Sequence, residues 1–124
     1  MITSTSFLVA SIVMLVLDYA YLSIMKNYFS RVVQTIQGSP LKVNMLSAGI
    51  TYIFMIFALQ YFVFGKESDN KVRDAFLLGL CIYAVFDFTN MAMFKDWGLL
   101  TVLMDSLWGA SLFAITTYIT LKLL

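Results

Sequence analysis

Four long apolar runs follow one another along the 124-residue chain and leave little of it for anything else. They cover residues 7–25, 43–64, 75–94 and 99–121. A transmembrane α-helix needs about 20 mostly apolar residues, so each run is long enough to cross a bilayer. Only 12% of the residues are charged, against about a quarter in ordinary soluble domains. The sequence therefore predicts one all-α domain over residues 1–124, a multi-pass membrane bundle of four transmembrane helices with antiparallel neighbours.

The three connections between the runs differ in length and charge. Residues 26–42 hold three basic residues, no acid and the break Gly38-Ser39-Pro40, so we expect an interfacial segment there. Residues 65–74 form the only charge-dense stretch and predict a hydrophilic loop in water. Residues 95–98 are so few that the last two helices must form an antiparallel hairpin. Four crossings place 26–42 and 95–98 on one face, opposite both termini, while the Lys/Arg count is tied and leaves the orientation open.

Three aspartates lie inside the apolar runs at nearly the same depth. Asp18 is seven residues before Met25, Asp87 is seven before Phe94, and Asp105 is six after Leu99. With a rise of 1.5 Å per residue, each lies roughly 10 Å inside the same membrane boundary. A charged side chain there costs at least about 2.5–3.5 kcal/mol, so each acid is a functional hypothesis. Helical spacing adds polar side chains at i+3 or i+4 from these acids, and the same depth in the second run adds two hydroxyl side chains. The predicted polar layer contains Asp18, Tyr21, Thr51, Tyr52, Asp87, Asn90, Asp105 and Trp108.

Two interpretations of this layer remain open. In the first, the aspartates and their neighbours satisfy one another by hydrogen bonds and hold the helices together, as polar residues commonly do in membrane bundles. In the second, three acids with no basic residue at their depth form a cation or proton site, since oxygen ligands suit hard cations. A structural layer should be dry and closed, whereas a transport site should meet a water-filled cavity.

The common catalytic residues are largely missing from the chain. Histidine is absent and Cys81 is the single cysteine, which excludes an intrachain disulfide, a Cys-based metal cage and the usual general base. The intramembrane aspartyl proteases need Tyr-Asp and Gly-x-Gly-Asp motifs, and the acids here follow Leu17, Phe86 and Met104 instead. We therefore expect no catalytic residue and no cofactor, and enzyme activity is the least favoured interpretation. A net charge of +1 argues against a nucleic-acid partner.

Three ordered motifs resemble those of a known family of small membrane proteins. They are Leu17-Asp18-Tyr19-Ala20-Tyr21-Leu22, Asp87-Phe88-Thr89-Asn90 and Asp105-Ser106-Leu107-Trp108-Gly109. Together they resemble the predicted membrane proteins of domain-of-unknown-function family 2177, over nearly the whole chain. Tyr21 stands where that family usually has tryptophan, and Phe86 where it has tyrosine. The resemblance implies four helices of this length and the same aspartates, without naming a reaction.

The family is found in bacteria and in large DNA viruses, so the resemblance also bears on the cellular setting. A viral copy would belong to the internal membrane beneath a capsid. The favoured prediction is a structural or accessory integral membrane protein whose partners are the lipid bilayer and other protein subunits of a larger assembly, in a virus an internal-membrane or minor capsid-associated component. The alternative is a small cation- or proton-coupled transporter or channel subunit that uses the aspartate layer.

Overall fold

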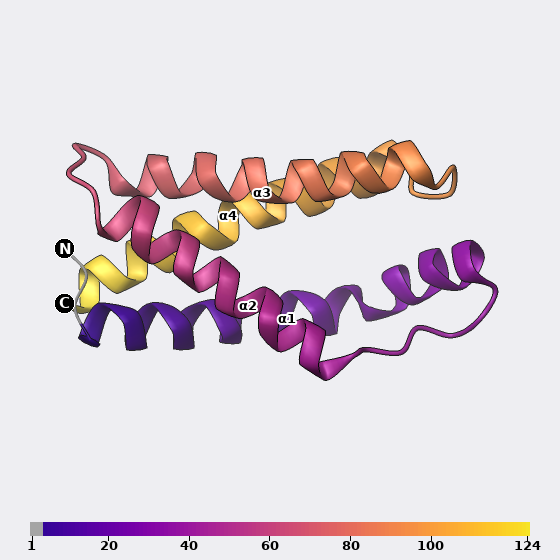
Figure 1. Ribbon diagram of the computed structural model, residues 1–124, viewed down its shortest axis with the longest axis horizontal. Helices are drawn as coiled ribbons and strands as arrows, with labels where there is room; N and C mark the ends of the chain where they lie inside the picture. Colours follow the sequence, from indigo (N-terminus) through magenta and orange to yellow (C-terminus); the bar gives the residue numbers. More distant parts are fainter. Residues whose placement is uncertain (1–3) are drawn as a thin grey trace.

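The computed structural model describes residues 4–124 and consists of four long helices joined by short connections (Figure 1). Each helix is long and apolar enough to cross a membrane, with a mean hydropathy between 1.6 and 2.1 over its most apolar stretch. The predicted all-α bundle of four membrane-spanning helices is therefore confirmed. The elements are α1 (Ser4–Gln37), α2 (Met45–Leu59) with its continuation as a π-helical turn, η1 (Gln60–Phe64), α3 (Lys71–Met93) and α4 (Leu99–Leu123).

The helix boundaries follow from local capping. Asn44 precedes α2 and its side chain accepts a hydrogen bond from the Ser47 amide at 3.0 Å, while Asn70 caps α3 by accepting from the Arg73 amide at 2.9 Å. Both bonds satisfy an amide that has no partner within its own helix. At the C-terminal end of α1, Gly38 has φ +74°, a left-handed conformation that ends the helix and that favours glycine.

α1 is longer than the sequence predicted. It continues through residues 26–37, so most of the segment expected at the interface consists of about three further turns of the same helix. No Gly or Pro interrupts the chain before Gly38, and the basic side chains of Lys26 and Arg31 remain exposed. At 1.5 Å per residue, 34 residues span about 51 Å, well beyond the roughly 30 Å hydrocarbon core of a bilayer. α1 therefore extends out of the core, tilts, or does both.

The helices are arranged around the α3–α4 hairpin (Figure 1). α3 and α4 share the most extensive interface, α1 packs against α4, and α2 contacts α1, while η1 packs against α3. Figure 1 places the α1–α2 and α3–α4 connections at one end of the bundle. The start of α1, the end of α4 and the α2–α3 loop lie at the opposite end. α2 crosses the others obliquely, so its first turns diverge from α3 while its last turn meets it.

Two glycines allow α3 and α4 to approach closely. A Cβ atom on Gly79 would overlap the carbonyl oxygen of Gly109, and a Cβ on Gly109 would overlap the ring of Tyr83. Small residues at such crossings let helix backbones pack together in membranes, where van der Waals contact replaces the hydrophobic effect. The half of the bundle nearer the chain ends is filled by fully buried apolar side chains, including Met14, Leu59 and Phe113.

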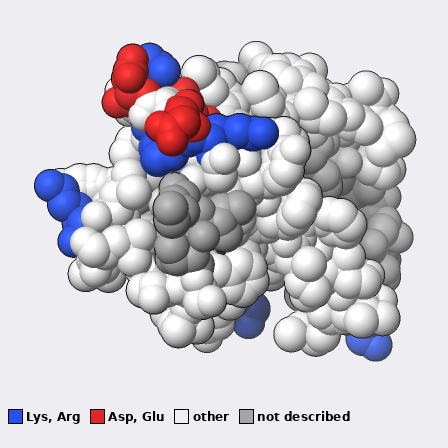
Figure 2. Space-filling view, turned by 60° about the vertical axis from the view of Figure 1, so that its left-hand side comes forward, with Lys and Arg blue, Asp and Glu red and all other residues white. Residues whose placement is uncertain are grey.

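The surface is largely apolar, as a bilayer requires. Figure 2 shows acidic and basic side chains gathered over the α2–α3 loop at one end of the molecule, with mostly uncharged surface beside them. The predicted loop 65–74 is shorter in the structure because α3 begins at Lys71, and the ion pair Arg73–Asp74, at 3.2 Å, lies in the first turn of that helix. Large apolar side chains such as Ile24, Phe54 and Leu100 are two-thirds exposed or more along the helices. Such a surface is suited to lipid, and the protein is integral to a membrane with several crossings.

Candidate intramembrane carboxyl site

The three aspartates of the apolar helices are all buried inside the bundle. Asp18 on α1 is 6% exposed, Asp87 on α3 is fully buried, and Asp105 on α4 is 8% exposed. Burial of acids is costly unless hydrogen bonds or opposite charges compensate them. The partners of each carboxyl group therefore decide what the site can do.

Asp18 receives hydrogen bonds from two other helices. The Trp108 indole Nε1 on α4 donates to its Oδ1 at 2.9 Å, and the Tyr52 hydroxyl on α2 donates to its Oδ2. Both oxygens of this carboxyl group are thus satisfied. The three side chains connect α1, α2 and α4 at one level of the bundle.

Asp105 and Asp87 form a second unit on the α3–α4 hairpin. The Tyr21 hydroxyl on α1 donates to Asp105 Oδ1 at 3.1 Å, and Ser106 donates to Asp87 Oδ2 at 3.3 Å. The Tyr21 ring stacks on the Trp108 indole with 4.6 Å between centroids and an interplanar angle of 3°, which orients both donors. The Asp87 and Asp105 carboxyl groups also interact directly with each other. Two carboxyl groups in contact cannot both be ionised without a compensating charge.

No basic side chain compensates these acids. Within residues 4–124, the ion pair that forms is Arg73–Asp74 in the first turn of α3. Asp87 Oδ1 and the Trp97 indole Nε1 are both buried, and neither makes a hydrogen bond of ordinary geometry within the described chain, although the indole acts on the Asp87 carboxyl group. The Asp87–Asp105 pair is therefore electrostatically incomplete, and a shared proton or a bound cation would complete it.

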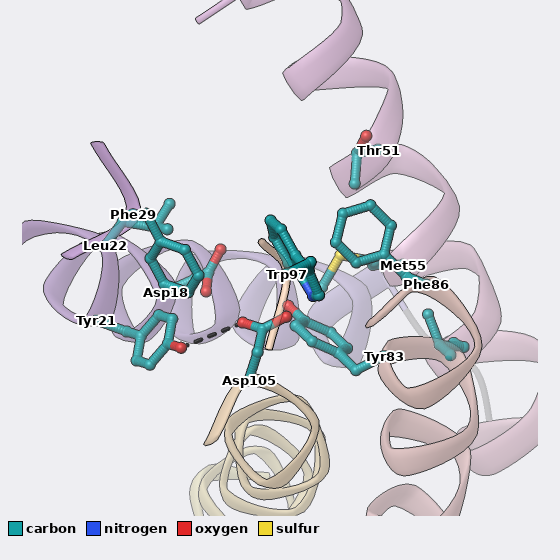
Figure 3. Close-up of a pocket in the computed structure, with 11 residues that line it drawn as sticks. Asp18, Tyr21, Leu22, Phe29, Thr51, Met55, Tyr83, Phe86, Trp97 and Asp105 are labelled. Atoms are coloured by element: carbon teal, nitrogen blue, oxygen red, sulfur yellow. Dashed lines mark hydrogen bonds between the residues drawn. The ribbon is translucent and has the colours of Figure 1, made fainter. Parts of the chain in front are cut away.

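A cavity of about 370 Å³ opens beside the carboxyl groups of Asp18 and Asp105. Asp18, Tyr21 and Asp105 lie at its polar side, while Met55 and Phe86 lie opposite them (Figure 3). Its volume falls in the range of small-molecule sites, which are mostly apolar with a few polar groups. The remaining lining residues are Leu22, Phe29, Thr51, Ile82, Tyr83 and Trp97.

A family model described as "Predicted membrane protein (DUF2177)" matches residues 3–122. The chain belongs to this family. The resemblance stated from the three motifs is thereby confirmed, and those motifs meet at the carboxyl site. Asp18 of the first motif accepts from Trp108 of the third, and Asp87 of the second interacts with Asp105. No curated protein and no solved structure matches the chain.

Of the other residues in the predicted layer, some contact the aspartates of this DUF2177 protein and others do not. Tyr21, Tyr52 and Trp108 each donate a hydrogen bond to one of them. Thr51 lines the cavity, but its hydroxyl donates to the Ser47 carbonyl of its own helix at 3.0 Å. Asn90 is half-buried and its side chain makes no hydrogen bond within the described chain, although a partner shared with the aspartates was expected.

The site also contains one serine and several aromatic residues that the predicted layer did not include. Ser106 directly follows Asp105 and faces Asp87, a position that helix geometry alone does not reveal. Trp97, in the short connection between α3 and α4, is only 8% exposed. It lies among other rings, with centroids 6.3 Å from Phe29 and 6.1 Å from Phe86. Phe29 reaches the site because α1 continues past the predicted end of the first helix.

The three aspartates do not converge on one point. Residues 4–124 contain no group of three or more His, Cys, Asp or Glu side chains placed to hold a metal ion together. The site instead consists of one hydrogen-bonded carboxyl group, Asp18, and one carboxyl pair, Asp87 and Asp105, on either side of Tyr21 and Trp108. Such an arrangement suits a proton shared by the pair, or a single cation in the adjacent cavity.

Proposed function

We propose that this membrane protein binds a cation or a proton at its intramembrane carboxyl groups and acts as a small cation- or proton-coupled transporter or channel subunit. The observation that carries this proposal is the pairing of Asp87 with Asp105, without a basic partner in residues 4–124, beside a cavity that Asp105 and Asp18 line. Intramembrane acids that face a cavity are typical of ion and proton pathways. A closed structural layer would have no need of the cavity.

The incomplete hydrogen bonding of Asp87 supports the same proposal. Its buried Oδ1 makes no hydrogen bond of ordinary geometry within residues 4–124, although the Trp97 indole acts on this carboxyl group, and an unsatisfied buried acceptor costs about 1–3 kcal/mol. A protein that used this aspartate only to hold α3 against α4 would gain from a neutral polar residue there. If the carboxyl pair binds and releases a cation or a proton, this function explains why the unsatisfied acceptor of Asp87 is retained.

A second candidate function is that of a structural or accessory protein within a larger membrane assembly, in a virus an internal-membrane component. It is supported by the hydrogen bonds themselves, which run from α2 to α1, from α4 to α1 and from α1 to α4 through Asp18 and Asp105. Such bonds fix the mutual positions of helices. On this view the partners are other protein subunits and the acids are kept neutral.

Ion flux in reconstituted vesicles distinguishes the two functions. We expect the parent protein to carry K⁺, Na⁺ or protons down an imposed gradient, and Asp105→Asn and Asp87→Asn to abolish the flux while the proteins remain folded. Asp69→Asn removes a carboxylate from the hydrophilic loop and is the matched control, with flux unchanged. Absence of flux from the folded parent, together with a protein partner recovered in fixed stoichiometry, would support the structural function instead.

A further inference from the structure

Aromatic rings surround the carboxyl groups of the cavity. Tyr21, Phe29, Tyr83, Phe86 and Trp97 all line it together with Asp18 and Asp105. A carboxylate attracts positive charge, and the faces of aromatic rings stabilise a cation further. Small inorganic cations prefer oxygen ligands, whereas organic ammonium groups are recognised by aromatic rings beside a negative charge. The lining therefore matches an organic ammonium better than a metal ion.

The Trp97 indole is a buried polar group of the lining whose hydrogen bonding is incomplete. It is about nine-tenths buried, and its Nε1 acts on the Asp87 carboxyl group without making a hydrogen bond of ordinary geometry within residues 4–124. Buried donors are nearly always paired, so this N–H can take a better-placed acceptor. An oxygen atom close to the ammonium nitrogen of a ligand, such as a hydroxyl, would supply it. Trp97 also reaches the centre of the cavity in Figure 3.

An apolar groove between α2 and α3 leads to the cavity from the side. The groove and the cavity adjoin each other, because both are lined by Thr51, Met55 and Ile82. The groove is also lined by Phe54 and Phe57, which are 67% and 57% exposed and would face lipid in a bilayer. An amphiphile dissolved in the membrane would reach the carboxyl groups through this groove without passing through water.

We propose that the cavity binds an amphiphilic organic ammonium taken from the bilayer through the α2–α3 groove, with its charged nitrogen between Asp18 and Asp105. The aromatic rings enclose the ammonium substituents, and the apolar part of the ligand extends toward Met55 and Ile82. This assignment rests on the proposed cation-binding function and adds the chemical class of the ligand. The reaction is binding or translocation alone, with no covalent step.

Intrinsic fluorescence measures binding at this site directly, because the only two tryptophans of the chain are Trp97 and Trp108. The probe is benzyldimethyl(2-hydroxyethyl)ammonium, added to the purified protein in lipid vesicles. Its neutral carbon isostere, 3,3-dimethyl-4-phenylbutan-1-ol, has the same shape without the charge. We expect saturable quenching or a spectral shift with the ammonium, and at least about tenfold weaker binding of the isostere.

Variants locate the binding within the site. Asp105→Asn should reduce the affinity at least about tenfold, and Asp69→Asn should leave it unchanged. Phe86 is 56% exposed, so Phe86→Leu should fold normally and weaken ammonium binding by about 2- to 10-fold without affecting the isostere. Ile82→Phe should slow association by narrowing the groove, whereas Leu77→Phe on the same helix, outside both the groove and the cavity, should not.

The outcomes separate this inference from the proposed function. Equal binding of the ammonium and its neutral isostere, or unchanged ammonium affinity in both Asp105→Asn and Phe86→Leu, would overturn the inference. Aspartate-dependent flux of K⁺, Na⁺ or protons without any ammonium binding would overturn it too, while leaving the proposed function in place. Absence of both flux and ammonium binding would overturn both.

Discussion

The hydrogen bonds of the site run between helices rather than along them. On the sequence, Asp18 shares a helix face with Tyr21, and Asp105 shares one with Trp108. In the structure the donors are exchanged, because Tyr21 donates to Asp105 and Trp108 donates to Asp18. The residue types and the depth were predictable from spacing. The pairing was not, because it depends on the rotation of α1 against α4, which a single sequence does not contain.

Substitutions of Asp87 can show whether folding requires a titratable carboxyl group at this position or only a hydrogen-bonding side chain. Asp87→Asn keeps the size and the acceptor for Ser106, so we expect a folded protein with nearly unchanged thermal stability. Asp87→Leu leaves the buried Ser106 hydroxyl and the Asp105 carboxyl group without this partner and should lower stability by about 1–3 kcal/mol. Thermal unfolding in detergent measures both, with Asp69→Leu as the exposed control. A Leu variant as stable as the parent would show that Asp87 contributes nothing to the fold.

Asp18 accepts two hydrogen bonds, which makes it suitable for a double-mutant cycle. Trp108→Phe and Tyr52→Phe each remove one donor and keep an aromatic ring. We expect each to lower the unfolding free energy by about 0.5–2 kcal/mol, as for other hydrogen bonds between membrane helices. The double variant should deviate from additivity by at least about 0.5 kcal/mol, because the two donors share one carboxyl group. Strict additivity in chemical unfolding would mean that the two bonds do not interact.

At the scale of the elements, the α3–α4 interface depends on two glycines. Gly109→Ala places a methyl group against the Tyr83 ring, which must shift, so we expect a loss of stability of about 1–3 kcal/mol. Tyr83→Leu in the same chain should restore part of it by making room. Gly49→Ala is the matched control, since nothing lies within 4 Å of its added Cβ and alanine favours the helix by about 0.5–1 kcal/mol. Equal effects at Gly49 and Gly109 in thermal unfolding would disprove the close approach.

The lengths of the elements could be predicted only in part. The apolar runs located all four helices, because about 20 apolar residues in succession leave few alternatives. The end of α1 was missed because Lys26 and Arg31 were interpreted as marking an interface, although neither interrupts a helix. The π-helical turn η1 was not predicted either, and the stretch Gln60–Phe64 contains no Gly or Pro that would signal it. A π-turn inserts one extra residue per turn and is set by tertiary packing.

At the scale of the whole molecule, the topology is accessible to cysteine labelling. Single cysteines at Ser39, Ser68 and Leu124 are introduced in a Cys81→Ala background, because Cys81 is exposed on α3. We expect a membrane-impermeant thiol reagent to label Ser39 from one side of sealed vesicles, and Ser68 and Leu124 from the other. Labelling of the Ser39 and Ser68 positions from the same side would rule out four crossings.

The short α3–α4 connection has a consequence for how the chain enters the bilayer. Two apolar helices separated by only five residues, 94–98, insert as one unit, and here that unit carries Asp87 and Asp105 on its inner faces. The two most expensive groups of the hairpin can therefore shield each other during biosynthesis, before α1 and α2 have packed against it. Asp18 has no such companion on its own helix and depends on Tyr52 and Trp108 arriving later. Packing of the hairpin and α2 against α1 is thus the step at which Asp18, the last unpaired acid, is removed from contact with lipid.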